Sequence, residues 1–348
     1  MKKILRWFNP ARFSDVVPQV ILFLISITLV FVFLLKPTRT FISTDPPPKI
    51  EPITSRLEHL GHKVETGIHL ENFHEFDLTN NSFVLNAIVW FKFNPSIISL
   101  DTIEKFSFEK GDILKRSKPI TKLIGNLVLA QYRIKFKFTT NLNYKVFPLN
   151  SHRIFITLTN KSVSPKELIF EASESGLTLS KNMLISGWKK DRHEVITGYS
   201  ESLLDRNDPT TKIFHPVIIF VLDFIRSGTR QLVVLFIPLL LFLYLMLFSL
   251  SLGKDLYIRR SIMSFGSISG IIGYRFVVER VSPKVGYLMF IDHIFNILLF
   301  ISLLIFIVNL ATKDKEYNFA RGLLVLIAHS MFLISLYYLC FYWAFEGV

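Results

Sequence analysis

The chain has 348 residues, of which 50% are hydrophobic, and it carries a formal net charge of +13. This combination excludes an ordinary soluble domain and also a chain embedded in lipid along its whole length. It predicts long apolar runs alongside a polar folded domain. The single cysteine, Cys340, excludes a disulfide framework and a cysteine-ligated metal site. The length predicts more than one folded unit.

The first apolar run covers Val16–Leu35 and is long enough for a membrane helix. Its basic start would also suit a signal peptide. No small-residue cleavage site precedes Lys36-Pro37, however, so an uncleaved anchor is the favoured interpretation. We therefore expect residues 1–36 to form a cytoplasmic tail and an N-terminal anchor. Residues 37–63 are expected to form a linker with a short helix.

Residues 64–229 show the period-two alternation of half-buried strands. Apolar side chains alternate with other residues along Ser82–Phe93 and along Val128–Phe138, and shorter strands are expected at Arg153–Leu158 and Val217–Ile225. Several such strands within one block, separated by Pro-, Asn- and Ser-rich breaks, predict a β-sandwich.

Residues 230–348 contain three strongly apolar runs at Leu232–Leu252, Val285–Leu310 and Leu323–Phe345. A weaker span, Arg260–Val278, is rich in Ser and Gly, which suits a helix that faces water or protein. With all five spans counted, the basic loops lie on one side of the membrane. This places the N-terminus inside, and the β-domain and the C-terminus outside.

Two polar residues within these spans are expected to be structural. Asp292 lies inside an apolar run, where an ionisable group is costly unless paired, and Arg275 or His293 could supply the partner. His329 is expected to be a hydrogen-bonded packing residue rather than a ligand.

The order of these parts, together with four local patterns, resembles the pentameric ligand-gated ion channels (the Cys-loop receptor superfamily) in their cysteine-less prokaryotic form. The likeness covers about Val64 to Phe345. The patterns are the turn Phe147-Pro148-Leu149-Asn150, Arg226 with Pro238 twelve residues later, Val278-Glu279 with Pro283 and Tyr287, and Trp90. The resemblance implies a β-sandwich followed by a four-helix transmembrane domain, with one additional N-terminal helix here.

The chain also departs from that family's pattern. Asn150 stands where the family has an aspartate, so its expected contact with Arg226 would be a neutral hydrogen bond, which is typically weaker. Lys92 stands where the family has another aspartate, and the paired cysteines are absent. The resemblance implies that the β-domain couples to the helices through five residues: Phe147, Pro148, Asn150, Arg226 and Pro283.

The resemblance also implies a pore lined by the weak span, Arg260–Val278. With Pro283 setting the register, the pore-facing residues are Ile262, Gly266, Ser269, Gly273 and Phe276. Glu279 and Arg280 would stand at the outer mouth, and Arg259 and Arg260 at the inner mouth. By charge alone, this inner mouth would favour anions.

A simpler interpretation of the same span stays open. Gly266 and Gly270 form a G-x-x-x-G pattern, followed by Gly273, and small residues at this spacing let helices pack closely. This would suit a non-conducting receptor, sensor or assembly protein with the same fold.

The resemblance places an agonist between subunits, beside the loop Leu203–Lys212. The candidate ligand-binding residues are Tyr132, Phe170, Tyr199, Asp205 and Arg206. The loop lacks aromatic residues, so an amine ligand is not supported, and core packing is the favoured interpretation for Tyr132.

Other classes of function receive no support. The sequence lacks the common hydrolase, metalloprotease and nucleotide-binding motifs, which argues against an enzyme, and no cofactor or metal is expected. The chain shows no sign of the inverted repeats that are typical of transporters. It also lacks a basic stripe interleaved with aromatic residues, so nucleic acid is not an expected partner. The expected partners are the lipid bilayer, further copies of the chain and an unidentified small-molecule or ion ligand, and the expected location is a bacterial inner membrane.

Overall fold

A computed structural model describes residues 15–343 apart from 40, 42, 44, 54–60, 182, 184, 205–207, 209–210, 228 and 313–317. The chain divides into two compact units. A β-rich unit comprises Ser43–Asn143 and Ser151–Ile225. A helical unit comprises Met1–Ile42, Tyr144–Asn150 and Arg226–Val348. The short segment Tyr144–Asn150 belongs to it although the elements before and after this segment in the sequence are strands. The short helix predicted within residues 37–63, near Ser55–His62, falls mostly outside the described residues, and His62 already belongs to a strand.

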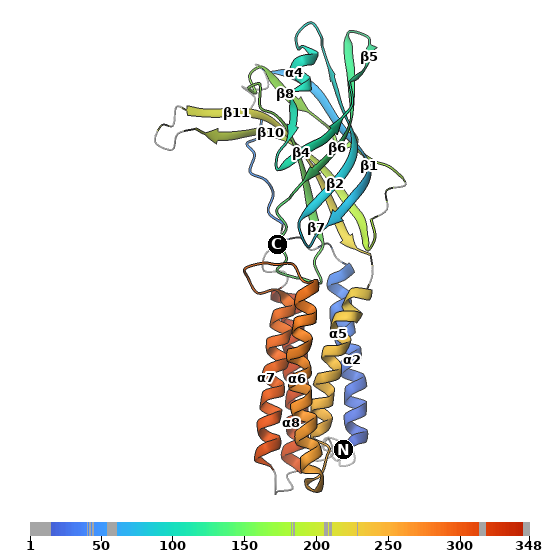
Figure 1. The fold of residues 1–348 in the computed structure, drawn as a ribbon, viewed down its shortest axis with the longest axis vertical. Coiled ribbons are helices and arrows are strands. Elements are labelled where there is room, and N and C mark those ends of the chain that lie inside the picture. The colour runs from blue at the N-terminus through green and yellow to red at the C-terminus, as the bar shows by residue number, and fades with distance from the viewer. Residues whose placement is uncertain are drawn as a thin grey trace, which may run out of the picture. The chain divides into compact units, whose positions relative to one another are not determined.

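The larger sheet of the β-rich unit has seven strands, with the order β4-β6-β2-β1-β8 (Figure 1). β5 pairs with β6 and β9 with β1. The strands are β1 (His62–Asp77), β2 (Ser82–Phe93), β4 (Gly111–Arg116), β5 (Ile120–Ile124), β6 (Leu127–Phe138), β8 (Leu168–Glu171) and β9 (Leu177–Leu179). The two long strands predicted from alternation are thus β2 and β6, and they are antiparallel neighbours.

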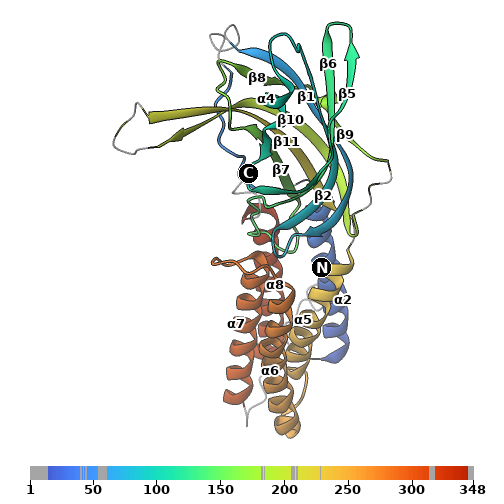
Figure 2. The same cartoon turned by 45° about the horizontal axis from the view of Figure 1, so that its top comes forward.

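The second sheet has the order β10-β11-β7-β3. Its strands are β3 (Phe106–Phe108), β7 (His152–Asn160), β10 (Trp188–Leu203) and β11 (Lys212–Arg226). β10 and β11 form a long ribbon, which Figure 2 shows extending beyond the other strands of this unit. A short helix, α4 (Leu100–Glu104), precedes β3, and the Ser99 hydroxyl caps its N-terminus.

The two sheets enclose one apolar core. The inward side chains of β2 all have exposed fractions of 2% or less, and they pack with residues of β6, β7 and β11. Aromatic rings fill much of this core, for example Phe108 stacked on Phe136 with ring centroids 4.2 Å apart. The period-two patterns therefore predicted the correct inward face of both long strands.

The helical unit contains five long apolar helices that could cross a membrane, counted among the described residues. They are α2 (Val16–Arg39), α5 (Arg230–Ser249), α6 (Tyr257–Val281), α7 (Phe290–Ala311) and α8 (Asn318–Tyr338), which continues as a π-helical turn at Leu339–Trp343. Several long apolar helices of this kind fit a membrane-embedded protein.

Within this unit, α5, α6 and α7 pack against one another, and α2 packs against α5 and α8. The predicted apolar run Val285–Leu310 begins earlier than the helix that it contains. The structure starts α7 at Phe290 rather than at Val285, because the chain between Ser282 and Met289 forms an irregular connection.

Candidate functional site

The helix α6 has two different faces. Its buried face packs against the other helices and consists of Arg260, Ser264, Ser267, Ile271 and Val278. The predicted pore-facing residues Ile262, Gly266, Ser269, Gly273 and Phe276 all lie on the exposed face. Ile262 and Phe276 are each 65% exposed. This helix is also the least apolar of the five.

The three glycines of α6 do not act as one packing stripe. A Cβ atom on Gly270 would lie 2.3 Å from the Phe242 ring of α5, so this glycine is needed for close helix packing. A Cβ atom on Gly266 or Gly273 would meet nothing within 4 Å in the described part of the chain. Only Gly270 therefore fulfils the packing interpretation within one subunit.

The charged residues at the two ends of α6 also divide between its exposed and its buried face. Arg259, Glu279 and Arg280 are exposed. Arg260 was predicted to stand at the inner mouth of the pore. Its side chain is instead fully buried within the subunit. Its guanidinium donates to the Asn309 carbonyl at 2.9 Å and to the Thr312 carbonyl at 3.0 Å, so it ties α6 to the end of α7.

A buried polar cluster continues from Arg260 along the interior of the helices. The Asn309 amide donates to the hydroxyls of Ser249 and Ser264 at 2.8 and 2.5 Å, and these hydroxyls lie 3.0 Å apart. Such bonds between helices stabilise packing where water is absent. The sequence pattern did not single out these residues, since isolated Ser and Asn carry no distinctive spacing.

Asp292 forms the expected ion pair with Arg275, and the Arg275 guanidinium also lies 5.2 Å from the centre of the Phe295 ring. Asp292 does not lie in the middle of a span, however. It stands in the first turn of α7 and accepts a hydrogen bond from the Met289 backbone N–H at 2.7 Å. A carboxylate in this position compensates the positive end of the helix dipole.

His329 is buried, as expected for a packing residue. Its Nδ1 lies 2.9 Å from the Val325 carbonyl, and its ring packs on Tyr244 with centroids 5.6 Å apart. Both contacts are internal to the helical unit.

The segment Tyr144–Asn150 caps the N-terminus of α7. The Phe290 N–H donates to the Lys145 carbonyl at 2.7 Å, and the Ile291 N–H donates to the Phe147 carbonyl at 3.2 Å. The first N–H groups of a helix have no partner within the helix, so these two carbonyls supply what α7 lacks. The Tyr144 N–H also donates to the Tyr287 hydroxyl at 2.8 Å.

The five predicted coupling residues all lie in the helical unit. Phe147, Pro148, Asn150 and Pro283 are buried, and the Phe147–Pro148 peptide bond is cis. Arg226 is half-buried and donates a hydrogen bond to the Gln231 side chain. Burial lowers the pKa of the Arg226 guanidinium to about 10.

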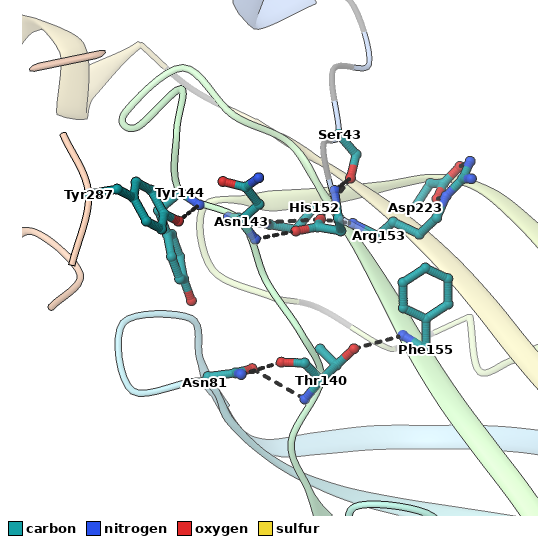
Figure 3. A network of polar contacts seen from close by, with 11 residues as sticks. Ser43, Asn81, Thr140, Asn143, Tyr144, His152, Arg153, Phe155, Asp223 and Tyr287 are labelled. Atoms are coloured by element: carbon teal, nitrogen blue, oxygen red, sulfur yellow. Dashed lines mark hydrogen bonds and ion pairs between the residues drawn. The ribbon is translucent and has the colours of Figure 1, made fainter. Parts of the chain in front are cut away.

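A buried carboxylate in the β-rich unit joins the coil that follows β6 to the start of β7. Asp45 accepts hydrogen bonds from the backbone N–H of Asn143 at 2.6 Å and of Arg153 at 2.8 Å. The Ser43 hydroxyl donates to it at 2.7 Å, and the His152 ring lies 3.4 Å away. Figure 3 shows these donors grouped together, with Arg153 also reaching Asp223. Because no pattern marks Asp45 as a hub, the sequence did not reveal this contact.

The structure separates the predicted ligand-binding residues. Tyr132 and Phe170 are at most 1% exposed and belong to the core, so they are not available to a ligand. Tyr199 lies beside a cavity of about 490 Å³, together with Phe214, Lys212, Pro165 and Lys166. The rings of Tyr199 and Phe214 meet edge to face, 5.6 Å apart. Asp205 and Arg206 lie outside the described residues.

Within the described residues, no group of three or more His, Cys, Asp or Glu side chains could hold a metal ion. Comparison of the sequence with protein-family models and with curated proteins finds no match.

Proposed function

We propose that the chain is a subunit of a homopentameric ligand-gated ion channel that favours anions. In this proposal, the two sheets form a β-sandwich outside a bacterial inner membrane, and α5–α8 form the four-helix channel domain. The helix α2 is an additional anchor, the N-terminus lies inside and the C-terminus outside. The proposal extends the resemblance found in the sequence.

The exposed face of α6 is the observation that carries this proposal. Long membrane helices whose polar and small residues point away from their own subunit need a partner other than lipid. Ser269, Gly266 and Gly273 on this face are open, and the helix is the least apolar of the five. Five copies arranged with this face inward would enclose a water-filled path.

The burial of Arg260 changes the charge expected at the inner mouth. Each subunit would contribute Arg259 alone, which gives five arginines in the ring rather than ten. A ring of one sign still attracts the opposite ion, so the expected selectivity remains for anions. Glu279 and Arg280 at the other end offset each other.

A ligand would bind at the cavity beside Tyr199. This cavity lies between the β10–β11 ribbon and the segment Ser164–Lys166, and it combines two aromatic rings with two lysines. Its volume is within the usual range for small-molecule sites. The proposal assigns the trigger for opening to this cavity.

The alternative function is a non-conducting receptor, sensor or assembly protein. Ile262 and Phe276 are large and apolar, and both are exposed. They would suit an α6 that packs against neighbouring subunits and leaves no open path.

Currents through the purified protein in planar bilayers distinguish these functions. Under a potassium chloride gradient, we expect the reversal potential to lie toward that of chloride. Arg259→Gln should shift the reversal potential toward zero, because the inner ring loses its charge. As a control, Arg230→Gln removes the same charge from the start of α5 and should leave the reversal potential unchanged. A reversal potential toward potassium would contradict the anion assignment, and a silent pentamer would support the alternative.

A further inference from the structure

A groove of about 410 Å³ on the larger sheet is strongly basic. It is lined by residues of β1, β2, β4 and β6 and of the chain just after β4: His74, Asn86, Lys115, Ser117, Arg133 and Lys135. None of the described residues that line it is acidic. It lies entirely within the β-rich unit and is distinct from the cavity beside Tyr199.

The strand register places these charges directly beside one another. Lys115 of β4 stands opposite Lys135 of β6, and Asn86 of β2 stands opposite Lys135 on its other side. Arg133 lies two residues before Lys135, on the same face of β6. Like charges directly opposite on neighbouring strands destabilise a sheet.

The same two strands pair opposite charges a short distance away. Asp112 of β4 stands opposite Lys137 of β6, which is the arrangement that stabilises a sheet. The repulsive Lys115–Lys135 pair is thus confined to the groove.

Little within the subunit relieves this repulsion. In the described part of the chain, neither Lys115 nor Lys135 forms an ion pair with a carboxylate. Among the described residues, Arg133 forms an ion pair with Glu71 alone, at the long distance of 3.5 Å, and the Arg133 side chain is 69% exposed. An exposed pair of this kind contributes little. Ser117 is already engaged, since its hydroxyl accepts from the Arg133 N–H at 3.0 Å and donates to the Lys118 carbonyl.

We propose that this groove binds a small soluble anion that carries two or more carboxylate or phosphate groups. One anionic group would bridge Lys115 and Lys135, and a second would reach Arg133 and His74. Charge-assisted hydrogen bonds to such groups are the strongest available to these side chains. Binding would convert a locally destabilising row of charges into a stabilising one.

Calorimetric titration of the full-length protein in detergent tests the proposal, with citrate as the multivalent probe and acetate as the monovalent one at equal ionic strength. We expect saturable citrate binding that is clearly tighter than acetate binding. The double variant Lys115→Gln/Lys135→Gln should weaken citrate binding by about tenfold or more, because two charged donors are lost. Lys137→Gln removes one charge from the same face of the same strand and should change it less than about twofold.

Two results would overturn the proposal. One is the absence of saturable citrate binding, or citrate binding no tighter than that of acetate. The other is an equal loss of affinity in the double variant and in Lys137→Gln, which would indicate attraction by net charge alone.

Thermal unfolding gives an independent readout in the same samples. Without ligand, the double variant should unfold at a temperature equal to or higher than the native chain, since the repulsion is removed. Citrate should raise the unfolding temperature of the native chain clearly more than that of the double variant at the same concentration; an equal rise in both would also overturn the proposal. Neither measurement depends on ion conduction, so its outcome is separate from that of the channel proposal.

Discussion

At the scale of single residues, Asp45 has the clearest structural role. Its side chain is fully buried and accepts from two backbone N–H groups and one hydroxyl. The backbone donors belong to Asn143, directly before the segment Tyr144–Asn150, and to Arg153, three residues after it. Asp45 therefore keeps together two stretches of the β-rich unit that are separated in sequence by residues 144–150.

Asp45→Asn should destabilise the protein, because an amide has one acceptor oxygen where the carboxylate has two. One buried donor then loses its partner, which costs about 1–3 kcal/mol. The unfolding temperature of the purified protein should fall measurably. Asp101→Asn is the matched control, since Asp101 forms only an exposed pair with Lys105 and its loss should have little effect. Equal unfolding temperatures for Asp45→Asn and the native chain would contradict this role.

Tyr132 is a second residue whose role the structure decides. Its ring packs on Phe106 with centroids 5.3 Å apart, and its hydroxyl has no hydrogen-bond partner among the described residues. Burial raises the pKa of Tyr132 to about 12. The folded form therefore holds its proton more firmly than the unfolded form, whose pKa is near 10. Stability from this source is complete below pH 10 and declines as the pH rises from 10 to 12.

Tyr132→Phe should consequently retain stability at neutral pH and lose less of it than the native chain between pH 10 and 12. Tyr132→Ala should cost about 3–5 kcal/mol through the cavity it leaves. Denaturant unfolding at several pH values measures both effects. A large loss of stability in Tyr132→Phe at neutral pH would show that the hydroxyl has a partner.

At the scale of elements, α6 combines one glycine that packs with two that do not. Gly270→Ala should destabilise the helical unit by about 1–3 kcal/mol, because the new methyl group overlaps the Phe242 ring. Gly273→Ala should be neutral or stabilise by up to about 1 kcal/mol, because alanine is the better helix former and meets no described neighbour. Thermal unfolding in detergent compares the two. A reversed order would place the buried face of α6 elsewhere.

The connection between α6 and α7 depends on a different contact, the Arg275–Asp292 pair. Asp292 is 5% exposed and also accepts the Met289 N–H. Removing one partner leaves an uncompensated buried charge, which typically costs about 3–5 kcal/mol. A double-mutant cycle with Arg275→Gln and Asp292→Asn should therefore give a coupling energy above about 1 kcal/mol. Additive effects of the two substitutions would refute a direct interaction.

The elements themselves were largely predictable from the sequence. Alternation over Ser82–Phe93 gave the bounds of β2, and the apolar runs located the long helices. The predicted start of α7 was too early, because Val285 and its apolar neighbours extend the apolar run without being helical. Apolar character reports burial or contact with lipid, whereas a helix start depends on which groups satisfy its first N–H groups.

At the scale of the whole molecule, the candidate site was predictable only in part. Helical spacing placed five residues on one face of α6, and that face is exposed in the subunit. The same spacing could not distinguish Arg259 from its neighbour Arg260, because the difference lies in acceptors at Asn309 and Thr312, far along the chain. Contacts in which one partner is a backbone group leave no side-chain pattern to detect. Examples are the Lys145 carbonyl, which accepts from Phe290, and the backbone N–H groups that donate to Asp45.

In the proposed channel, several copies of the chain assemble with the exposed face of α6 toward a common axis. Averaged particle images of the detergent-solubilised protein, viewed along the membrane normal, test this arrangement most directly. We predict five-fold symmetry with α6 nearest the axis. Particles without five-fold symmetry, or with another helix at the axis, would contradict the account.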